Sequence, residues 1–305
     1  MSPAGNRLVP PQCLFVFIDL EATGLDVSTD DIIEIGALCC LWKDGEWCEW
    51  SPAPFQQYVA TSRKLDPFIV KLTGITNVKL DSCGIPVERA FSLLVQWLED
   101  CRAKAPRNVG ELCPTWLVAH NGLCFDFPML ASVDKQIADS RRFFPQRPLS
   151  LFRRLGVSGV VDTLRVSRQL GGSRGHSLSK LHRVYARGST VTFHSAVGDC
   201  EALAAVAASP KFSRAWATER IGLALDKIQI LGRVSTPQET ACRQPEVPPR
   251  TASRAPVKVA AQQAAVPPVS PAPAPFFWRA FCCRRRKQAW LASESLQGST
   301  QYGTS

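Results

Sequence analysis

The first apolar run of the chain leads directly into two carboxylates. Phe15–Ile18 is short, aromatic and β-branched, which predicts a buried strand. Asp19 and Glu21 follow, and alternate side chains of a strand share a face, so both carboxylates point the same way. Like charges at the end of an apolar strand repel each other unless a cation lies between them. The pattern therefore predicts either a hard divalent cation held by oxygen ligands or a strand that ends in a solvated polar turn.

Two further strands are predicted downstream of the first. Asp31–Leu38 and Gln57–Val59 contain the β-branched and aromatic residues that favour extended chain. Between them, Trp42–Glu46 contains Gly45 and predicts a hairpin turn. Consecutive strands of this kind predict an antiparallel meander at one side of a sheet.

Helical and strand patterns alternate along the following residues. The clearest helix is Pro86–Arg102, where apolar residues form one stripe. Asp66–Leu72 begins with an aspartate and a proline, and Gly74 follows its end, as helix termini favour. The remaining predicted helices begin at Phe125, Leu178 and Ser195, and the remaining strands are Trp116–Ala119 and Val160–Thr163. The alternation predicts an α/β fold: a mixed sheet, with an antiparallel meander plus parallel strands, flanked by helices on both faces.

The composition of the chain changes at about Arg233. Thr236–Pro275 is dominated by Pro, Ala, Val, Gln and Arg without periodicity, which predicts a disordered linker. The formal net charge is +10, of which +7 lies after residue 232, and this balance favours a polyanionic partner without identifying it. We therefore divide the chain into a lead-in (1–12), a domain (13–232), a linker (233–275) and a tail (276–305).

Cysteine usage and hydropathy bear on the compartment. The twelve cysteines are scattered through apolar segments and form no C-x-x-C pair, which favours a reduced, intracellular location. The apolar run Leu14–Ile18 is too short for a signal peptide. No apolar run reaches the length of about 20 residues that a bilayer requires, so we expect no transmembrane helix.

Further acidic residues occur in settings that suit a catalytic site. Asp126 follows the predicted strand Trp116–Ala119 after a short polar loop, so it can lie at the same sheet edge as Asp19. Asp199 lies five residues after His194, on the first turns of a predicted helix. Two-metal phosphoryl transfer needs several carboxylates and no soft ligands, and a neutral imidazole can accept a proton from an attacking water. Taken singly, a His–Asp pair at this spacing is more often a surface pair, and an Asp at a helix start is more often a cap.

Several short motifs occur in a fixed order. They are Phe17–Leu25, Ile32–Gly36, Val118–Gly122, Phe125–Pro128, Val161–Thr163, Ser177-Leu178 with Leu181 and Tyr185, and His194–Asp199. Together they resemble the DEDDh, or DnaQ-like, 3′–5′ exonucleases, and the three-prime repair exonuclease branch in particular. That branch similarly has E-A-T-G-L in its first motif, A-H-N-G followed by D-F-P in its second, and H-x-A-x-G-D in its third. The resemblance covers roughly residues 13–210.

The resemblance implies a fold, a chemistry and partners. It implies an RNase H-like sheet, dependence on two Mg²⁺ ions for which Mn²⁺ can substitute, and release of nucleoside monophosphates. By position, it assigns metal ligation to Asp19, Glu21, Asp126 and Asp199, and the role of general base to His194. It implies DNA 3′ ends as the partner. Because mammalian members of the branch dimerise through edge strands, it also implies a homodimer.

The resemblance also assigns contacts with the terminal nucleotide. It implies that Ala22, Thr23 and Leu25 line this nucleotide, with backbone N–H groups near its 3′-OH and Leu25 wedged against the base. Ile75 resembles a position that packs on the terminal bases, and an ordinary core residue fits its context equally well. The full set expected to bind substrate is Glu21, Ala22, Thr23, Leu25, Ile75, His120, Asn121 and His194, with His120 and Asn121 supporting the second motif.

Three functions fit these residues. The leading hypothesis is a metal-dependent 3′–5′ exodeoxyribonuclease that acts on single-stranded or frayed ends. An RNA 3′-end trimming exonuclease is an alternative, because no residue in the sequence reads a 2′-OH unambiguously. A nucleic-acid-binding module without catalysis is disfavoured, because all four carboxylates and His194 are present.

The end of the chain has three interpretations. Phe276–Phe281 is mostly aromatic and apolar, Cys282 and Cys283 follow, and Arg284–Lys287 is basic. A basic run is most often a solvated or nonspecific anion-binding stretch. Interfacial aromatics, two acylated cysteines and a polybasic patch together predict peripheral membrane attachment, and the basic run also fits a nuclear import signal. We therefore expect the cytoplasm or the nucleus, with membrane association through residues 276–287 as one of the three interpretations.

Overall fold

The central strand of the fold is β1, the apolar run at the start of the sequence. A computed structural model of the chain describes residues 12–48, 52–105, 113–140, 150–171, 175–213 and 222–224. In it, β1 (Gln12–Ala22) pairs antiparallel with β2 (Ile32–Lys43) on one side and parallel with β5 (Thr115–Ala119) on the other. Apolar strands buried on both faces read as continuous hydrophobic runs, which is why this segment lacks a clean alternation.

The sheet is mixed, as the sequence predicts. Its order is β3-β2-β1-β5-β6-β7, and β4 also pairs with β2. The pairings of β2 with β1, β3 and β4 are antiparallel, β1, β5 and β6 run parallel, and β7 is antiparallel to β6. The remaining strands are β3 (Glu46–Trp47), β4 (Phe55–Tyr58), β6 (Val157–Asp162) and β7 (Gly222–Ala224).

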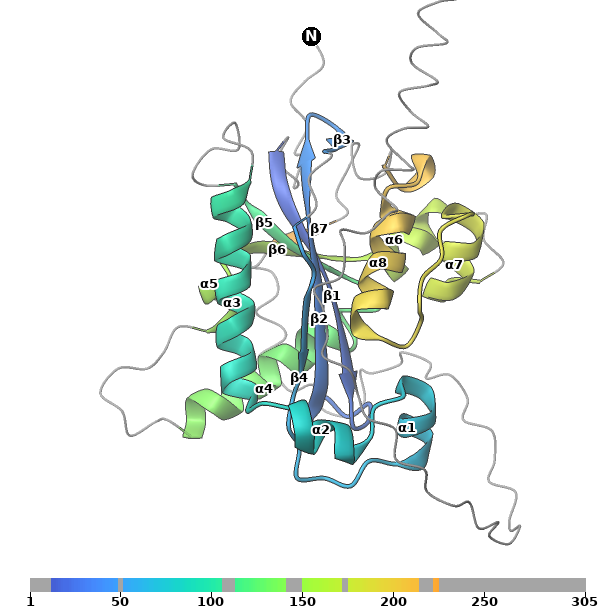
Figure 1. Cartoon of the computed structure of the whole chain (residues 1–305). Helices are drawn as coiled ribbons and strands as arrows, with labels where there is room; N and C mark the ends of the chain where they lie inside the picture. Colours follow the sequence, from blue (N-terminus) through green and yellow to red (C-terminus); the bar gives the residue numbers. More distant parts are fainter. Residues whose placement is uncertain are drawn as a thin grey trace, which may run out of the picture.

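Helices cover both faces of the sheet (Figure 1). One face packs against α3 (Val87–Lys104), α4 (Asp126–Ser140) and α5 (Leu151–Arg154). The opposite face packs against α6 (Thr163–Leu170), α7 (Leu178–Tyr185) and α8 (Ala196–Ala207). Two short helices, α1 (Pro67–Thr73) and α2 (Asn77–Cys83), lie at the end of the sheet where β1 finishes (Figure 1). The layered α/β arrangement confirms the predicted fold class.

Side chains of β1 alternate between the two cores. Val16 and Ile18 belong to the core under α3 and α4, whereas Phe15 and Phe17 belong to the core under α8. The alternation follows from the pleat of a strand, in which successive side chains point to opposite faces. Odd-numbered residues of β1 therefore face α8, which places the side chains of residues 19 and 21 on that side.

Several helix and strand ends lie where the capping and turn residues of the sequence predict them. The Asp66 side chain accepts a hydrogen bond from the Phe68 backbone at 2.7 Å, and Gly74 ends α1 with φ +70°. Asp44 and Gly45 both have positive φ and form the turn after β2, as a type I′ hairpin turn requires. This turn leads into β3, whereas the sequence predicted that the next strand would be at Gln57–Val59.

Other boundaries differ from the prediction. The strand predicted at Phe15–Ile18 continues to Ala22, because β2 provides partners for every residue up to that point, and the carboxylates thus lie within the strand. The sequence pattern did not predict α2, α5, α6 or β7. Two of these helices have side-chain caps: Thr76 accepts from the Lys79 backbone at 3.2 Å, and Asp162 accepts from the Leu164 backbone at 2.9 Å.

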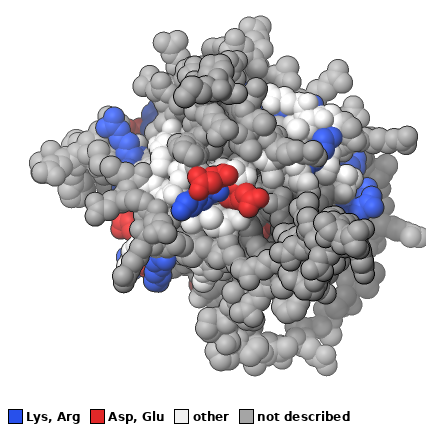
Figure 2. All heavy atoms as spheres, turned by 90° about the horizontal axis from the view of Figure 1, so that it is seen from above, with Lys and Arg blue, Asp and Glu red and all other residues white. Residues whose placement is uncertain are grey.

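Several predictions concern residues outside the described part of the chain. The lead-in apart from its last residue, the linker 233–275 and the tail 276–305 lie there, so the proposed domain boundaries and the interpretations of the tail stay predictions. Among the described helices, none is long and apolar enough to cross a membrane. In the view from above, the acidic and basic side chains that are visible among the described residues lie in small separate groups (Figure 2).

The helix α3 offers a test of this packing. Phe91 is 0% exposed in the core under α3, so Phe91→Ala should lower the free energy of unfolding by about 3–5 kcal/mol. The matched control is Phe68→Ala, because Phe68 is 66% exposed on α1, and its effect should stay within about 0.5 kcal/mol. Urea denaturation followed by circular dichroism measures both values. Equal losses for the two variants would contradict the described orientation of α3.

Candidate active site

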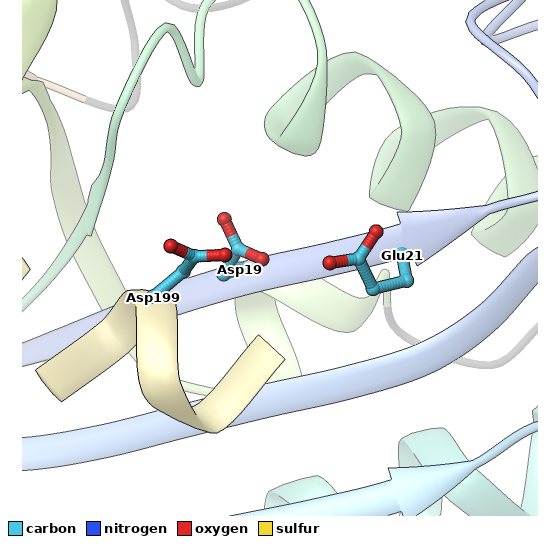
Figure 3. A group of neighbouring side chains, drawn as sticks. All are labelled: Asp19, Glu21 and Asp199. Carbon is cyan, nitrogen blue, oxygen red and sulfur yellow. The ribbon is translucent and has the colours of Figure 1, made fainter. Parts of the chain in front are cut away.

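Three carboxylates from two distant segments converge at the face of the sheet covered by α8. Asp19, Glu21 and Asp199 each offer one oxygen, and these oxygens all lie within 4.8 Å of one another. Asp19 and Glu21 come from β1, and Asp199 comes from the first turn of α8 (Figure 3). The predicted placement of Asp19 and Glu21 on one face of a strand therefore matches the structure.

The close approach of α8 to the sheet brings Asp199 to this place. Asp19 pairs with Gly36 of β2, and a Cβ at residue 36 would overlap the backbone of Ala196, the first residue of α8. A Cβ at residue 198 in the same turn would overlap the carbonyl of Thr192, so Gly198 lets the segment before α8 pass close to this turn. Because Gly36 has no side chain, the first turn of α8 can rest directly on β2, and Asp199 reaches the strand that carries Asp19.

The electrostatics of the cluster oppose ionisation of its carboxyl groups in the absence of a cation. Burial is the main cause in each case, and the neighbouring carboxylates add to it. The pKa of Asp19 is raised well above its usual range, that of Glu21 is raised to about 8, and that of Asp199 to about 6. Mg²⁺ and Mn²⁺ prefer oxygen ligands, and such a cation would relieve the repulsion among these carboxylates. The residues therefore fit a hard divalent cation.

The fourth predicted ligand, Asp126, lies beside the cluster but outside the group of three. It is the first residue of α4 and is buried, and one of its oxygens accepts a hydrogen bond from the Leu20 backbone at 3.2 Å. This contact confirms that Asp126 reaches the same part of the sheet as Asp19. Burial raises its pKa to about 7, and Asp162 and Asp199 contribute through their charges. Its carboxylate also raises the pKa of Asp19, so the two groups interact electrostatically.

The predicted base, His194, lies directly before α8 and is exposed. Its backbone has φ +62°, an uncommon conformation for a residue with a side chain, and its N–H donates to the Asp199 carboxylate at 2.9 Å. The hydrogen bond and the imidazole both hold the pKa of Asp199 lower than burial alone would set it. The sequence therefore placed this histidine and this ligand correctly as neighbours, while the role of base stays a prediction.

The loop after β1 is held by polar contacts. The hydroxyl of Thr23 donates to Asp30 at 2.9 Å and accepts from the Asp31 backbone at 3.0 Å. The backbone N–H of Thr23 donates to the carbonyl of Asp31 at 2.9 Å, so this N–H already has an acceptor and is not available for a 3′-OH. Ala22 is buried, whereas Leu25 is 67% exposed, which leaves its side chain accessible to a ligand.

His120 and Asn121 belong to a network around Asp162 and Thr163. The Asp162 carboxylate accepts from the backbone of Asn121 at 3.0 Å and of Leu123 at 3.2 Å, and Asn121 has φ +63°. His120 shares a hydrogen bond of 3.0 Å with the Thr163 hydroxyl, and burial lowers the pKa of its imidazole. This network fixes the loop that leads to Asp126, in line with the expected support of the second motif.

Ile75 lies in a small core cluster. It is 1% exposed and packs in a cluster with Ile33, Leu65 and Leu80. This environment is the one expected for an ordinary core residue, which was the alternative interpretation of this position. Contact between Ile75 and terminal bases stays a prediction.

Two residues of the site were not selected from the sequence. Glu34 and Asp162 were noted only as parts of motifs, yet both are buried carboxylates that hold loops or helices around the cluster. The signal for Glu34 was its position inside the apolar run Ile32–Leu38, because a charged residue in a buried strand needs a partner.

Comparison with known proteins relates this site to nucleases. Residues 16–104, which include Asp19 and Glu21, match the exonuclease family RNase_T. Human three prime repair exonuclease 2 is 27% identical over 196 residues, which cover 62% of this chain and 80% of that protein. Bovine three-prime repair exonuclease 1 is 27% identical over 227 residues, which cover 66% of this chain and 65% of that protein.

More distant matches are partial. The PolC-type DNA polymerase III of Staphylococcus haemolyticus is 28% identical over 198 residues, which cover 63% of this chain and 11% of that protein. Escherichia coli exonuclease I, solved in complex with a dT13 oligonucleotide, has a TM-score of 0.47 and 19% identity, covering 64% of this chain and 40% of that one. The exonuclease family match and the curated relatives confirm the resemblance drawn from the motifs.

The raised pKa values predict a pH-dependent response to divalent cations. A carboxyl whose pKa is higher in the folded state than in the unfolded chain stabilises the fold below its unfolded pKa, and this contribution is lost as pH rises through the folded value. Asp199, with a pKa of about 6, loses this contribution as pH rises to about 6. Glu21, with a pKa of about 8, loses it as pH rises to about 8. Mg²⁺ should therefore raise the melting temperature more at about pH 8 than at about pH 5.5, where protons compete for the same oxygens.

Thermal melts in EDTA and in excess MgCl₂ at both pH values measure this difference. Asp199→Asn removes one ligand from the cluster and should reduce the Mg²⁺-dependent shift at the higher pH. A shift of the same size at both pH values would argue against cation binding by these carboxylates.

Proposed function

We propose that this chain is a divalent-cation-dependent 3′–5′ exonuclease that hydrolyses DNA from 3′ ends to nucleoside monophosphates. The preferred substrate is single-stranded or frayed DNA, and the mechanism uses two metal ions. The observation that carries the proposal is the convergence of Asp19, Glu21 and Asp199 within 4.8 Å. The exonuclease family match over residues 16–104 and the similarity to three prime repair exonucleases support it.

The four carboxylates would hold the cations. Asp19, Glu21 and Asp199 form the cluster, and Asp126 lies beside Asp19. The chemistry that divalent cations supply in such sites is activation of water and charge neutralisation on the phosphate oxygens. Mg²⁺ suits these oxygen ligands, and Mn²⁺ can substitute for it.

His194 is the residue that takes the proton from the attacking water in this proposal. It is exposed, so its imidazole can reach a substrate-bound water, and its backbone is tied to Asp199. The His194 backbone combines this hydrogen bond with a φ of +62°. A backbone anchored to a proposed metal ligand limits how far the imidazole can lie from the reacting phosphate, and proton transfer requires this proximity.

The loop after β1 is proposed to receive the terminal nucleotide. Thr23 is fixed by its contacts with Asp30 and Asp31, while Leu25 remains exposed two residues further along. Arg63 forms ion pairs with Asp30 at 3.6 Å and Asp31 at 3.3 Å, which further hold this loop. A rigid loop that presents one apolar side chain is suited to packing against a base, which is the role proposed for Leu25.

Asp19→Asn is expected to abolish turnover while leaving nucleic-acid binding largely intact, because it removes a charged metal ligand and preserves the shape of the side chain. The assay is Mg²⁺-dependent digestion of matched 3′-labelled and 5′-labelled single-stranded DNA and RNA, with binding measured by fluorescence anisotropy. Asp100→Asn is the matched control, because Asp100 is an exposed residue of α3 on the opposite face of the sheet.

The pattern of products separates the alternatives. Stepwise shortening from the 3′ end of DNA supports the proposal, and shortening of RNA alone would instead identify an RNA 3′-end trimming enzyme. Full activity of Asp19→Asn would falsify the site assignment. Binding by the wild type without cleavage of either substrate would favour a nucleic-acid-binding module.

His194→Ala should lower kcat by about 10²–10⁴-fold with little change in KM, since the base acts on the reacting water and not on substrate affinity. Steady-state kinetics on single-stranded DNA provide both constants. Asp100→Asn again serves as the control, because Asp100 is an exposed residue of α3 on the opposite face of the sheet. An unchanged kcat for His194→Ala would rule out the proposed proton acceptor.

A further inference from the structure

Glu34 is a buried carboxylate in the middle of the apolar strand β2. Its side chain is 1% exposed, and its strand neighbours are isoleucines. It pairs with Glu21 in the register between β1 and β2, so it lies directly beside one of the three carboxylates of the cluster. A charged group in this position is costly unless both of its oxygens are hydrogen-bonded.

Both oxygens of Glu34 have donors. One accepts from the side-chain amide of Gln56 at 2.6 Å, and the other accepts from the backbone N–H of Ala196 at 3.2 Å. Ala196 is the first residue of α8, and Ser195, the N-cap residue, makes no side-chain capping bond. Glu34 therefore supplies, from a distant strand, an acceptor for the first N–H of α8, which has no partner within the helix.

This contact controls the turn that carries Asp199. Asp199 lies three residues after Ala196, in the first turn of α8. Gly36, two residues along β2 from Glu34, contacts the same turn so closely that a Cβ there would overlap the Ala196 backbone. Because Gly36 pairs with Asp19 and Glu34 pairs with Glu21, the two residues of β2 that face these ligands also hold the helix that supplies the third.

We propose that Glu34 is a positioning residue that fixes the first turn of α8 against β2 and so keeps Asp199 beside Asp19 and Glu21 for cation binding. The inference rests on the cation site of the proposed function and extends it to a residue outside the group of ligands. Glu34 acts through its hydrogen bonds, because the Gln56 amide and the Ala196 N–H already occupy its two oxygens.

Two different replacements of Glu34 distinguish the effect of its hydrogen bonds from the effect of its charge. Glu34→Gln retains an oxygen that can accept from the Ala196 N–H, and the Gln56 amide can turn to accept from the new NH₂ group. Glu34→Ala removes both acceptors and leaves the Ala196 N–H without a partner. Residues that orient metal ligands typically change metal affinity by about 10–100-fold when they are removed.

The experiment measures Mn²⁺ affinity of the full chain by calorimetry and by the electron paramagnetic resonance signal of free Mn²⁺. Glu34→Ala should weaken Mn²⁺ binding at least about tenfold, and Glu34→Gln should remain within about threefold of the wild type. Glu99→Ala is the matched control, because Glu99 is exposed on α3, and it should leave the affinity unchanged.

A second variant tests the same hydrogen bond from the other side and remains informative if Glu34→Ala does not fold. Ala196→Pro removes the donor, and proline is favoured at the first position of a helix. Ser195 before it is extended, with φ −131° and ψ 128°, as a residue preceding proline requires. Ala196→Pro should lower Mn²⁺ affinity to a similar extent as Glu34→Ala, and the double variant should show no further loss.

The outcomes distinguish this inference from the proposed function. Wild-type Mn²⁺ binding that disappears in Asp19→Asn but persists unchanged in Glu34→Ala or in Ala196→Pro overturns the role of Glu34 alone. An equal loss in Glu34→Gln and Glu34→Ala would assign the effect to the charge and also overturn it. If the wild type shows no Mn²⁺ binding that depends on Asp19, the proposed cation site is rejected and this inference with it.

Discussion

Repulsion among carboxylates that the fold forces together is the constraint on which the rest of this structure depends. Asp19, Glu21 and Asp199 come from segments about 180 residues apart in sequence, and their oxygens lie within 4.8 Å. Burial raises the pKa of each one and neighbouring carboxylates, Glu34 among them, add to it, so the metal-free arrangement opposes ionisation. A fold keeps such a cluster only when its other interactions impose the geometry, and a cation converts the repulsion into binding energy.

The two apolar cores impose that geometry. Alternate residues of β1 enter the cores under α3 and under α8, so the strand cannot shift by one position without moving Phe15 and Phe17 out of their core. This register places Asp19 and Glu21 on the side of α8. On the same side, Gly36 lets the first turn of α8 rest on β2, and Glu34 accepts its first N–H. Packing thus holds the charged groups in place.

Further polar contacts surround the cluster and hold residues that have proposed roles in hydrolysis. Asp162 holds the loop that leads to Asp126, and the His194 backbone is hydrogen-bonded to Asp199. In each case a fixed backbone supports a residue with a proposed role in phosphodiester hydrolysis. Leu25, in contrast, is largely exposed in the loop after β1. The proposed function assigns cation binding to the carboxylates and contact with a terminal base to Leu25.

The sequence by itself determined the central strand, the shared face of Asp19 and Glu21, and the caps of α1. It also determined the order of the motifs that resemble the exonucleases. Each of these features depends on neighbouring residues and their periodicity. Only the tertiary structure decided that Asp126 stands outside the group of three, that Ile75 is buried in a core cluster, and that Glu34 caps α8. These features depend on contacts between residues far apart in the chain, and the hydrogen bond from Ala196 to Glu34 spans 162 positions. Local pattern identifies the groups capable of a contact, whereas packing of the sheet and helices selects the partner.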